Sequence, residues 1–125
     1  MHHSARGLLA AAAILGGLGL AACGDTDAPE AAAPDCSAEP GKTVTVEIGD
    51  FLFDPTPVEV SRCDEVVWHN VHSQPHTSTG NATQRWNTGN LAPDATSGPI
   101  RFEDAGEFTY ICALHPFMEG TVQVS

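Results

Sequence analysis

Positive charge is the scarcest feature of this 125-residue sequence. Five Lys and Arg stand against sixteen Asp and Glu, which gives a formal net charge of −11. All the acidic residues follow Cys23, where only Lys42, Arg62, Arg85 and Arg101 oppose them. Nucleic acid, whose phosphates are bound by Lys and Arg, is therefore not expected as a partner, whereas a basic protein surface would be attracted.

Long apolar runs are also missing, apart from the stretch between residues 8 and 22. This stretch is too short and too rich in Ala and Gly for a membrane-spanning helix. It follows Arg6 and ends in small residues, which is the order of a secretory signal. The final "LAAC" resembles the lipobox in which the cysteine, here Cys23, is lipidated and becomes the N-terminus. We therefore predict a lipoprotein-type signal peptide over residues 1–22; the alternative is an ordinary signal that happens to precede a cysteine.

The segment after the signal has little apolar bulk. Residues 24–41, "GDTDAPEAAAPDCSAEPG", consist mainly of Ala, Pro and acidic residues. This composition predicts an acidic tether over residues 23–41, anchored by lipid at Cys23 to a membrane and facing the periplasm or the cell exterior. About a hundred residues remain, and we expect one domain over residues 42–125.

A sustained helical period is absent after the signal, and a period of two takes its place. Alternation of side-chain type is seen in "KTVTVEI", "PVEV", "DEVVWHN", "GEFTYIC" and "GTVQVS". Gly and Pro separate these runs throughout. Short strands bounded by turn residues predict an all-β domain, either a sandwich or a barrel.

Three cysteines remain once Cys23 is set aside, and an odd number means that one has another task. Cys112 lies among His and Met, so Cys36 and Cys63 are the natural pair. Their disulfide would close a loop of 63 − 36 = 27 residues, worth about 3.5 kcal/mol by loop entropy. The sequence alone does not prove this pairing.

The stretch "YICALHPFMEG" places Cys112, His115 and Met118 three residues apart. Thiolate selects soft metals, imidazole suits copper and zinc, and a thioether favours copper. A blue-copper electron-transfer site has a plane of two His and one Cys with a weak axial Met, so a second His is needed. His76 is the best candidate, since it follows Pro75 in the segment after the strand that contains Trp68.

From about Val44 to Val124 the chain resembles the small blue-copper proteins, the cupredoxins of the amicyanin and plastocyanin type. The resemblance is carried by "CALHPFM", "FLFDPTPVEV", "VVWHN", "PH", "WNTG" and "GEFTYIC". It implies a Greek-key β-sandwich that binds one copper ion through His76, Cys112 and His115, with Met118 as the axial ligand.

Two positions depart from the family pattern. Thr77 follows the first ligand, where these proteins commonly have Asn, and Cys63 replaces the Gly that often precedes "D-x-V-x-W". The other histidines of this region, His69 and His72, are predicted to be solvated surface residues without a second metal.

The predicted function is electron transfer by copper cycling between Cu(I) and Cu(II), without enzyme activity. A complete set of four ligands leaves no open position for a substrate. An exported copper chaperone or storage protein is the alternative, but such proteins usually have Met-rich or His-rich sites, and only two Met occur here. The resemblance further implies a monomer that meets redox partner proteins at an apolar surface around His115.

Overall fold

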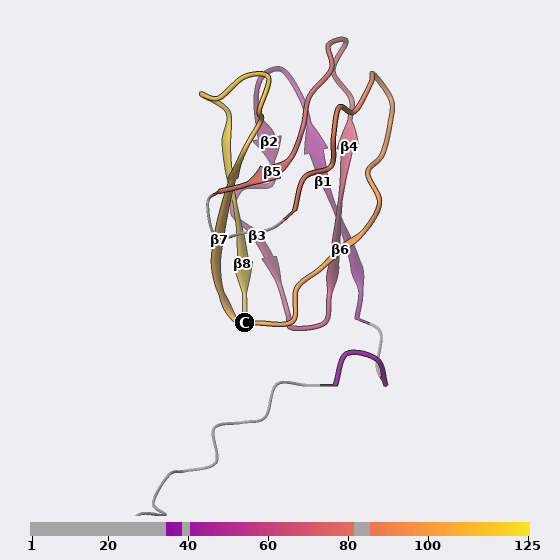
Figure 1. Cartoon of the computed structure of the whole chain (residues 1–125), viewed down its shortest axis with the longest axis vertical. Helices are drawn as coiled ribbons and strands as arrows, with labels where there is room; N and C mark the ends of the chain where they lie inside the picture. The colour runs from indigo at the N-terminus through magenta and orange to yellow at the C-terminus, as the bar shows by residue number, and fades with distance from the viewer. Residues whose placement is uncertain (1–34, 39–40, 82–85) are drawn as a thin grey trace, which may run out of the picture. The chain divides into compact units, whose positions relative to one another are not determined.

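The computed structural model describes residues 35–38, 41–81 and 86–125 and confirms the all-β prediction (Figure 1). The strands are β1 (Thr43–Ile48), β2 (Phe53–Asp54), β3 (Val58–Val60), β4 (Glu65–Asn70), β5 (Thr79–Gly80), β6 (Ile100–Arg101), β7 (Gly106–Ile111) and β8 (Glu119–Val124). They form two four-stranded sheets, ordered β2-β1-β4-β6 and β3-β8-β7-β5. The domain is therefore a sandwich and not a closed barrel.

Both sheets contain neighbouring strands that are far apart in the sequence. β1 lies parallel to β4, and β3 lies parallel to β8. A parallel pair cannot be joined by a hairpin, so the chain must cross over before it returns to the same sheet. Because β1 and β4 run in one direction, the loops that follow them emerge at the same end of the sandwich.

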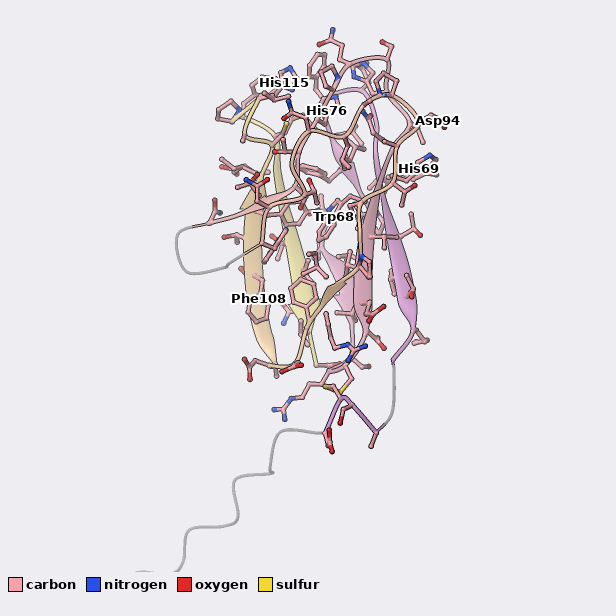
Figure 2. All side chains as sticks on the ribbon, turned by 45° about the vertical axis from the view of Figure 1, so that its right-hand side comes forward. Trp68, His69, His76, Asp94, Phe108 and His115 are labelled. Atoms are coloured by element: carbon pink, nitrogen blue, oxygen red, sulfur yellow. A yellow bond between two sulfur atoms is a disulfide. The ribbon has the colours of Figure 1, made fainter. Side chains whose placement is uncertain are left out.

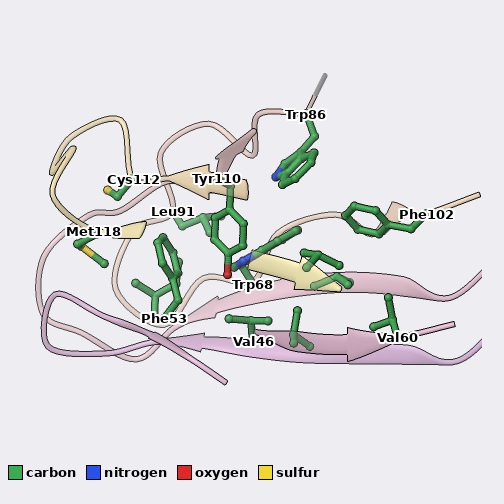
Figure 3. Close-up of a cluster of buried hydrophobic side chains, with 14 of the residues drawn as sticks. Val46, Phe53, Val60, Trp68, Trp86, Leu91, Phe102, Tyr110, Cys112 and Met118 are labelled. Atoms are coloured by element: carbon green, nitrogen blue, oxygen red, sulfur yellow. The ribbon is translucent and has the colours of Figure 1, made fainter. Parts of the chain in front are cut away.

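The period of two places the core residues as the sequence predicts. Val66, Trp68 and Asn70 alternate with more exposed neighbours along β4, and all three are fully buried. Trp68 stacks on Trp86 and meets Tyr110 edge to face, so aromatic rings from both sheets fill the centre (Figure 3). The apolar faces of the two sheets thus supply the main stabilisation of the fold.

The disulfide between Cys36 and Cys63 is present, which confirms the predicted pairing. Cys63 has a φ of +73°, in the left-handed region that glycine favours, so its backbone conformation suits the Gly of the family pattern. Gly41 passes so close that an added Cβ would clash with the Cys63 carbonyl oxygen. The chain before β1 is therefore packed tightly against the start of β4.

The predicted signal peptide over residues 1–22, Cys23, and most of the tether over residues 23–41 lie outside the described residues. Within the described ranges, no helix is long and apolar enough to cross a membrane.

Candidate metal centre

Two loops at one end of the sandwich bring the predicted ligands together. His76 lies in the loop after β4, whereas Cys112, His115 and Met118 lie between β7 and β8. Figure 2 shows His76 and His115 close to each other at this end. The end of β4 and the end of β7 therefore position the donor groups from opposite sheets.

Three donor atoms form a compact triangle. The Cys112 Sγ atom lies 3.6 Å from Nδ1 of His76 and 3.6 Å from Nδ1 of His115. The two Nδ1 atoms are 3.2 Å apart. Three donor atoms bonded to one metal ion at about 2.0–2.3 Å, and lying in a plane with it, are separated by distances of this size. These three residues form the metal-ligand cluster found among the described residues.

The β7–β8 loop explains the three-residue spacing. His115 N donates to the Cys112 carbonyl at 3.1 Å, and Met118 N donates to the His115 carbonyl at 2.8 Å. Cys112 N in turn donates to the Met118 carbonyl at 3.1 Å. Two successive turns, closed by a bond across the loop, bring Cys112 and Met118 to one end of the core (Figure 3).

Thr77 connects the two loops. Its hydroxyl accepts a 2.7 Å hydrogen bond from Ala113 N, and its own N–H points at the Cys112 sulfur at 3.3 Å. The hydroxyl therefore provides the side-chain contact expected of the Asn that is common at this position.

Exposure differs among the candidate ligands. His76 and Cys112 are fully buried and Met118 is 2% exposed, whereas His115 is only partly buried. Burial lowers the pKa of His76, and the nearby His115 and His72 lower it further. A neutral imidazole is the form that binds a metal, so this environment favours ligation.

Two neighbouring residues differ from the sequence expectation. The prediction of a solvated His72 is wrong, because its side chain is 17% exposed and its Nδ1 lies 2.9 Å from Nε2 of His76. Phe51, which the sequence reasoning missed, packs edge-on against His76 and His115 at ring distances of 5.8 and 5.0 Å. Its place depends on a φ of +56°, which no sequence pattern reveals. His69, by contrast, pairs with the exposed Asp94 (Figure 2).

The donor chemistry fits copper. One thiolate and two imidazoles form the triangle, and a buried thioether lies in the same loop. Zinc sites with sulfur ligands use Cys and His, whereas a Cys–His–His plane with a nearby Met is the arrangement of blue-copper sites. Copper is therefore the metal that this set of residues suits best.

Comparisons with known proteins agree with this chemistry. The family model of copper-binding proteins of the plastocyanin/azurin family matches residues 41–125. Amicyanin-alpha of Methylorubrum extorquens is 30% identical over 109 residues, which cover 84% of this chain and 92% of that protein. Amicyanin of Paracoccus denitrificans is 29% identical over 90 residues, 65% of this chain and 64% of that protein.

Solved structures give the same fold. An oxidised amicyanin variant is 26% identical with a TM-score of 0.61, over 66% of this chain and 81% of that chain. A purple cupredoxin from Nitrosopumilus maritimus, 24% identical, also has a TM-score of 0.61 over 66% of this chain and 99% of that chain. The chain therefore belongs to the plastocyanin/azurin family of copper-binding proteins, and its β-sandwich is a small cupredoxin.

Proposed function

We propose that this protein is an electron carrier whose copper cycles between Cu(I) and Cu(II). In this proposal His76, Cys112 and His115 form the equatorial ligands and Met118 the axial one. The observation that carries it is the triangle of Nδ1, Nδ1 and Sγ atoms, with edges of 3.2–3.6 Å, next to the buried Met118.

The protein's contribution is to keep these residues still. Copper, when bound, supplies the one-electron chemistry. His76 is held on both sides of its backbone, because its N–H donates to the Leu91 carbonyl at 3.1 Å and its carbonyl accepts from Leu91 N at 2.7 Å. Cys112 is held by Met118 and Thr77. A ligand set fixed in this way rearranges little when the metal charge changes, which favours fast electron transfer.

His115 is the proposed point of electron exchange with partner proteins. Among the candidate ligands it alone is partly exposed, whereas the other three are buried. Leu114 is 44% exposed and Phe117 71% exposed, and these two residues flank His115 in the loop. Phe117 therefore contributes to an apolar contact surface more than to shielding the metal, whereas Phe51 lies against the imidazoles. An apolar patch of this kind allows close approach of a partner.

Export is supported by the disulfide, since disulfides persist in oxidising compartments. We propose further that Cys23 is lipidated and anchors the domain to a membrane through the acidic tether. The mass of the protein isolated from membranes tests this proposal. An unmodified N-terminus would contradict it.

The visible spectrum of the copper-loaded protein tests the carrier function. We expect an intense blue absorption, arising from the Cys112 thiolate, that a reductant bleaches and an oxidant restores. The matched control is Cys112→Ser, which keeps the size of this buried side chain but should lose the intense band while remaining folded. A colourless or weakly coloured parent protein would instead favour an open site, as in a copper chaperone or an enzyme.

A further inference from the structure

His72 lies next to His76, on the side of the His76 ring that faces away from the proposed metal position. Its Nδ1 atom is 2.9 Å from Nε2 of His76, an ordinary hydrogen-bond distance. On its other side, Nε2 of His72 is 3.6 Å from Oδ1 of Asp50. Asp50, His72 and His76 thus form a chain of polar groups that ends at the copper triangle.

The position of His72 is fixed by its surroundings. Its backbone N–H donates to Oδ1 of the fully buried Asn70 at 2.9 Å. Asn70 Nδ2 donates to the carbonyls of Gln74 and Leu91, so its side-chain amide ties the loop of His72 to the neighbouring segment at Leu91. The Phe51 ring packs edge-on against the His72 ring at 5.0 Å. A side chain held from its backbone and from its ring face can orient a neighbour.

The direction of the hydrogen bond follows from the role of His76. Nδ1 of His76 faces Cys112 and His115, so it must carry no proton in order to bind a metal. The proton of the neutral ring then lies on Nε2, which donates to Nδ1 of His72. Nδ1 of His72 accepts, and therefore the proton of His72 lies on Nε2, facing the Asp50 carboxylate.

We propose that His72 is a positioning residue that holds His76 in the Nε2–H tautomer and fixes the orientation of its ring toward the metal. This inference rests on the proposed function, in which His76 is a ligand. A partner that accepts the second ring N–H of a ligand histidine fixes its tautomer and makes it a stronger donor. A stronger donor stabilises Cu(II) more than Cu(I), so His72 also lowers the reduction potential.

Two substitutions separate hydrogen bonding from packing. His72→Leu removes the hydrogen-bond acceptor for His76 and places an apolar side chain against Phe51. His72→Asn places an amide oxygen near the position of Nδ1, so it restores the acceptor. The control is His69→Leu, because His69 pairs with the exposed Asp94 and contacts no proposed ligand.

The tautomer is read from the imidazole NMR shifts of the copper-free protein, at a pH well above the ordinary pKa of histidine. Cu(II) affinity is measured by competition with a chelator, and the reduction potential by titration. We expect His76 to carry its proton on Nε2 in the parent. In His72→Leu we expect a mixture of tautomers, a Cu(II) affinity reduced about tenfold or more, and a raised potential. His72→Asn should recover most of the affinity, and His69→Leu should match the parent.

Other results would contradict this role of His72. If the His76 proton in the parent lies on Nδ1, or if His72→Leu matches the parent in affinity and potential, His72 does not position the ligand. If His72→Asn is as weak as His72→Leu, packing and not the acceptor is responsible. Failure of the parent to bind copper would refute the proposed function instead, and the copper-free NMR measurement would still decide the tautomer.

Discussion

At the scale of single residues, two of the four proposed ligands also belong to the hydrophobic core. Cys112 and Met118 are both members of the buried cluster that includes Trp68 and Tyr110. A buried thioether in a core is commonly a packing residue, so its burial does not by itself assign a ligand role. Substitutions that preserve packing are therefore needed to separate the two roles of Met118.

Met118→Leu and Met118→Gln make this separation. Leu preserves volume, so the loss of stability should stay below about 1.5 kcal/mol. If Met118 is the axial ligand, removing its sulfur should destabilise Cu(II) and raise the reduction potential, whereas the harder amide oxygen of Gln should lower the potential. Both variants should retain copper. A potential unchanged in both, measured by redox titration, would mean that Met118 only packs.

Tyr110 gives a prediction about alkaline pH. It is the single tyrosine of the chain, and burial raises its pKa from 10.0 to about 12. Between these values the folded protein keeps the phenol proton that the unfolded chain releases, so stability falls as the pH rises above 10. The loss should reach about 2 kcal/mol near pH 12.

Tyrosinate absorbance, followed together with denaturant unfolding, checks this expectation. Tyr110→Phe is the control, because it abolishes the tyrosinate signal and should remove this alkaline dependence of stability. Ionisation of the folded parent near pH 10, without loss of stability, would show that the phenol is not buried as described.

Residue-level sequence reasoning predicted the four proposed ligands but missed the residues that surround them. The spacing of Cys112, His115 and Met118 is a local signal, and His76 follows from the need for a second imidazole. His72 and Phe51 carry no such signal, because their contacts depend on the path of two loops and on a positive φ. Prediction fails where a contact is made by tertiary structure alone.

At the scale of elements, strands of three or more residues were predictable and two-residue strands were not. The alternating runs correspond to β1, β3, β4, β7 and β8. β2, β5 and β6 contain two residues each, too few to show a period of two. These three strands pair at the sheet edges, so their position is determined by the partner strand and not by their own residue pattern.

The disulfide and the metal site lie at opposite ends of β4. Cys63 precedes β4 by two residues and His76 follows it by six, and a six-residue strand spans about 20 Å. Replacing Cys36 and Cys63 together with Ala should therefore reduce the free energy of unfolding by about 3.5 kcal/mol without changing the visible spectrum. Denaturant unfolding of the copper-free protein measures this loss.

A matched double variant isolates the backbone contribution at Cys63. Cys36→Ala combined with Cys63→Gly should lose about 1 kcal/mol less than the Ala pair, because Gly accepts the φ of +73° without strain. Loss of the blue band in either double variant would contradict the claim that the metal site does not depend on the disulfide.

At the scale of the whole described domain, the exposed large hydrophobic side chains lie at the end of the sandwich that carries the proposed metal site. The large hydrophobic residues exposed there are Leu52, Val71, Leu114 and Phe117, all in loops that follow β1, β4 or β7. Exposed acidic residues also lie at this end, among them Asp50 in the loop after β1 and Asp94, whose N–H donates to the Asn70 carbonyl at the end of β4. This distribution supports an apolar contact at His115 together with longer-range attraction of a basic partner.

Charge placed at the contact should slow electron exchange and leave the copper unaffected. We expect Leu114→Lys and Phe117→Lys to reduce the rate with the partner substantially while the visible spectrum stays nearly unchanged. Ala105→Lys is the control, since it adds the same charge to an exposed position before β7. Raised salt should slow the parent, because screening acts over about 10 Å at moderate ionic strength. If both contact variants exchange electrons at the parent rate, the docking surface must lie elsewhere on the protein.

The most direct test of the central claim is X-ray absorption at the copper edge, recorded on the oxidised and the reduced protein. A rigid site built from Cys112, His76 and His115 predicts one strong sulfur neighbour and two imidazole nitrogens in both states, with nearly unchanged distances. Met118 would add a weaker and more distant sulfur. A copper shell without sulfur, or one whose ligand number changes on reduction, would contradict the assignment of this protein as a blue-copper electron carrier.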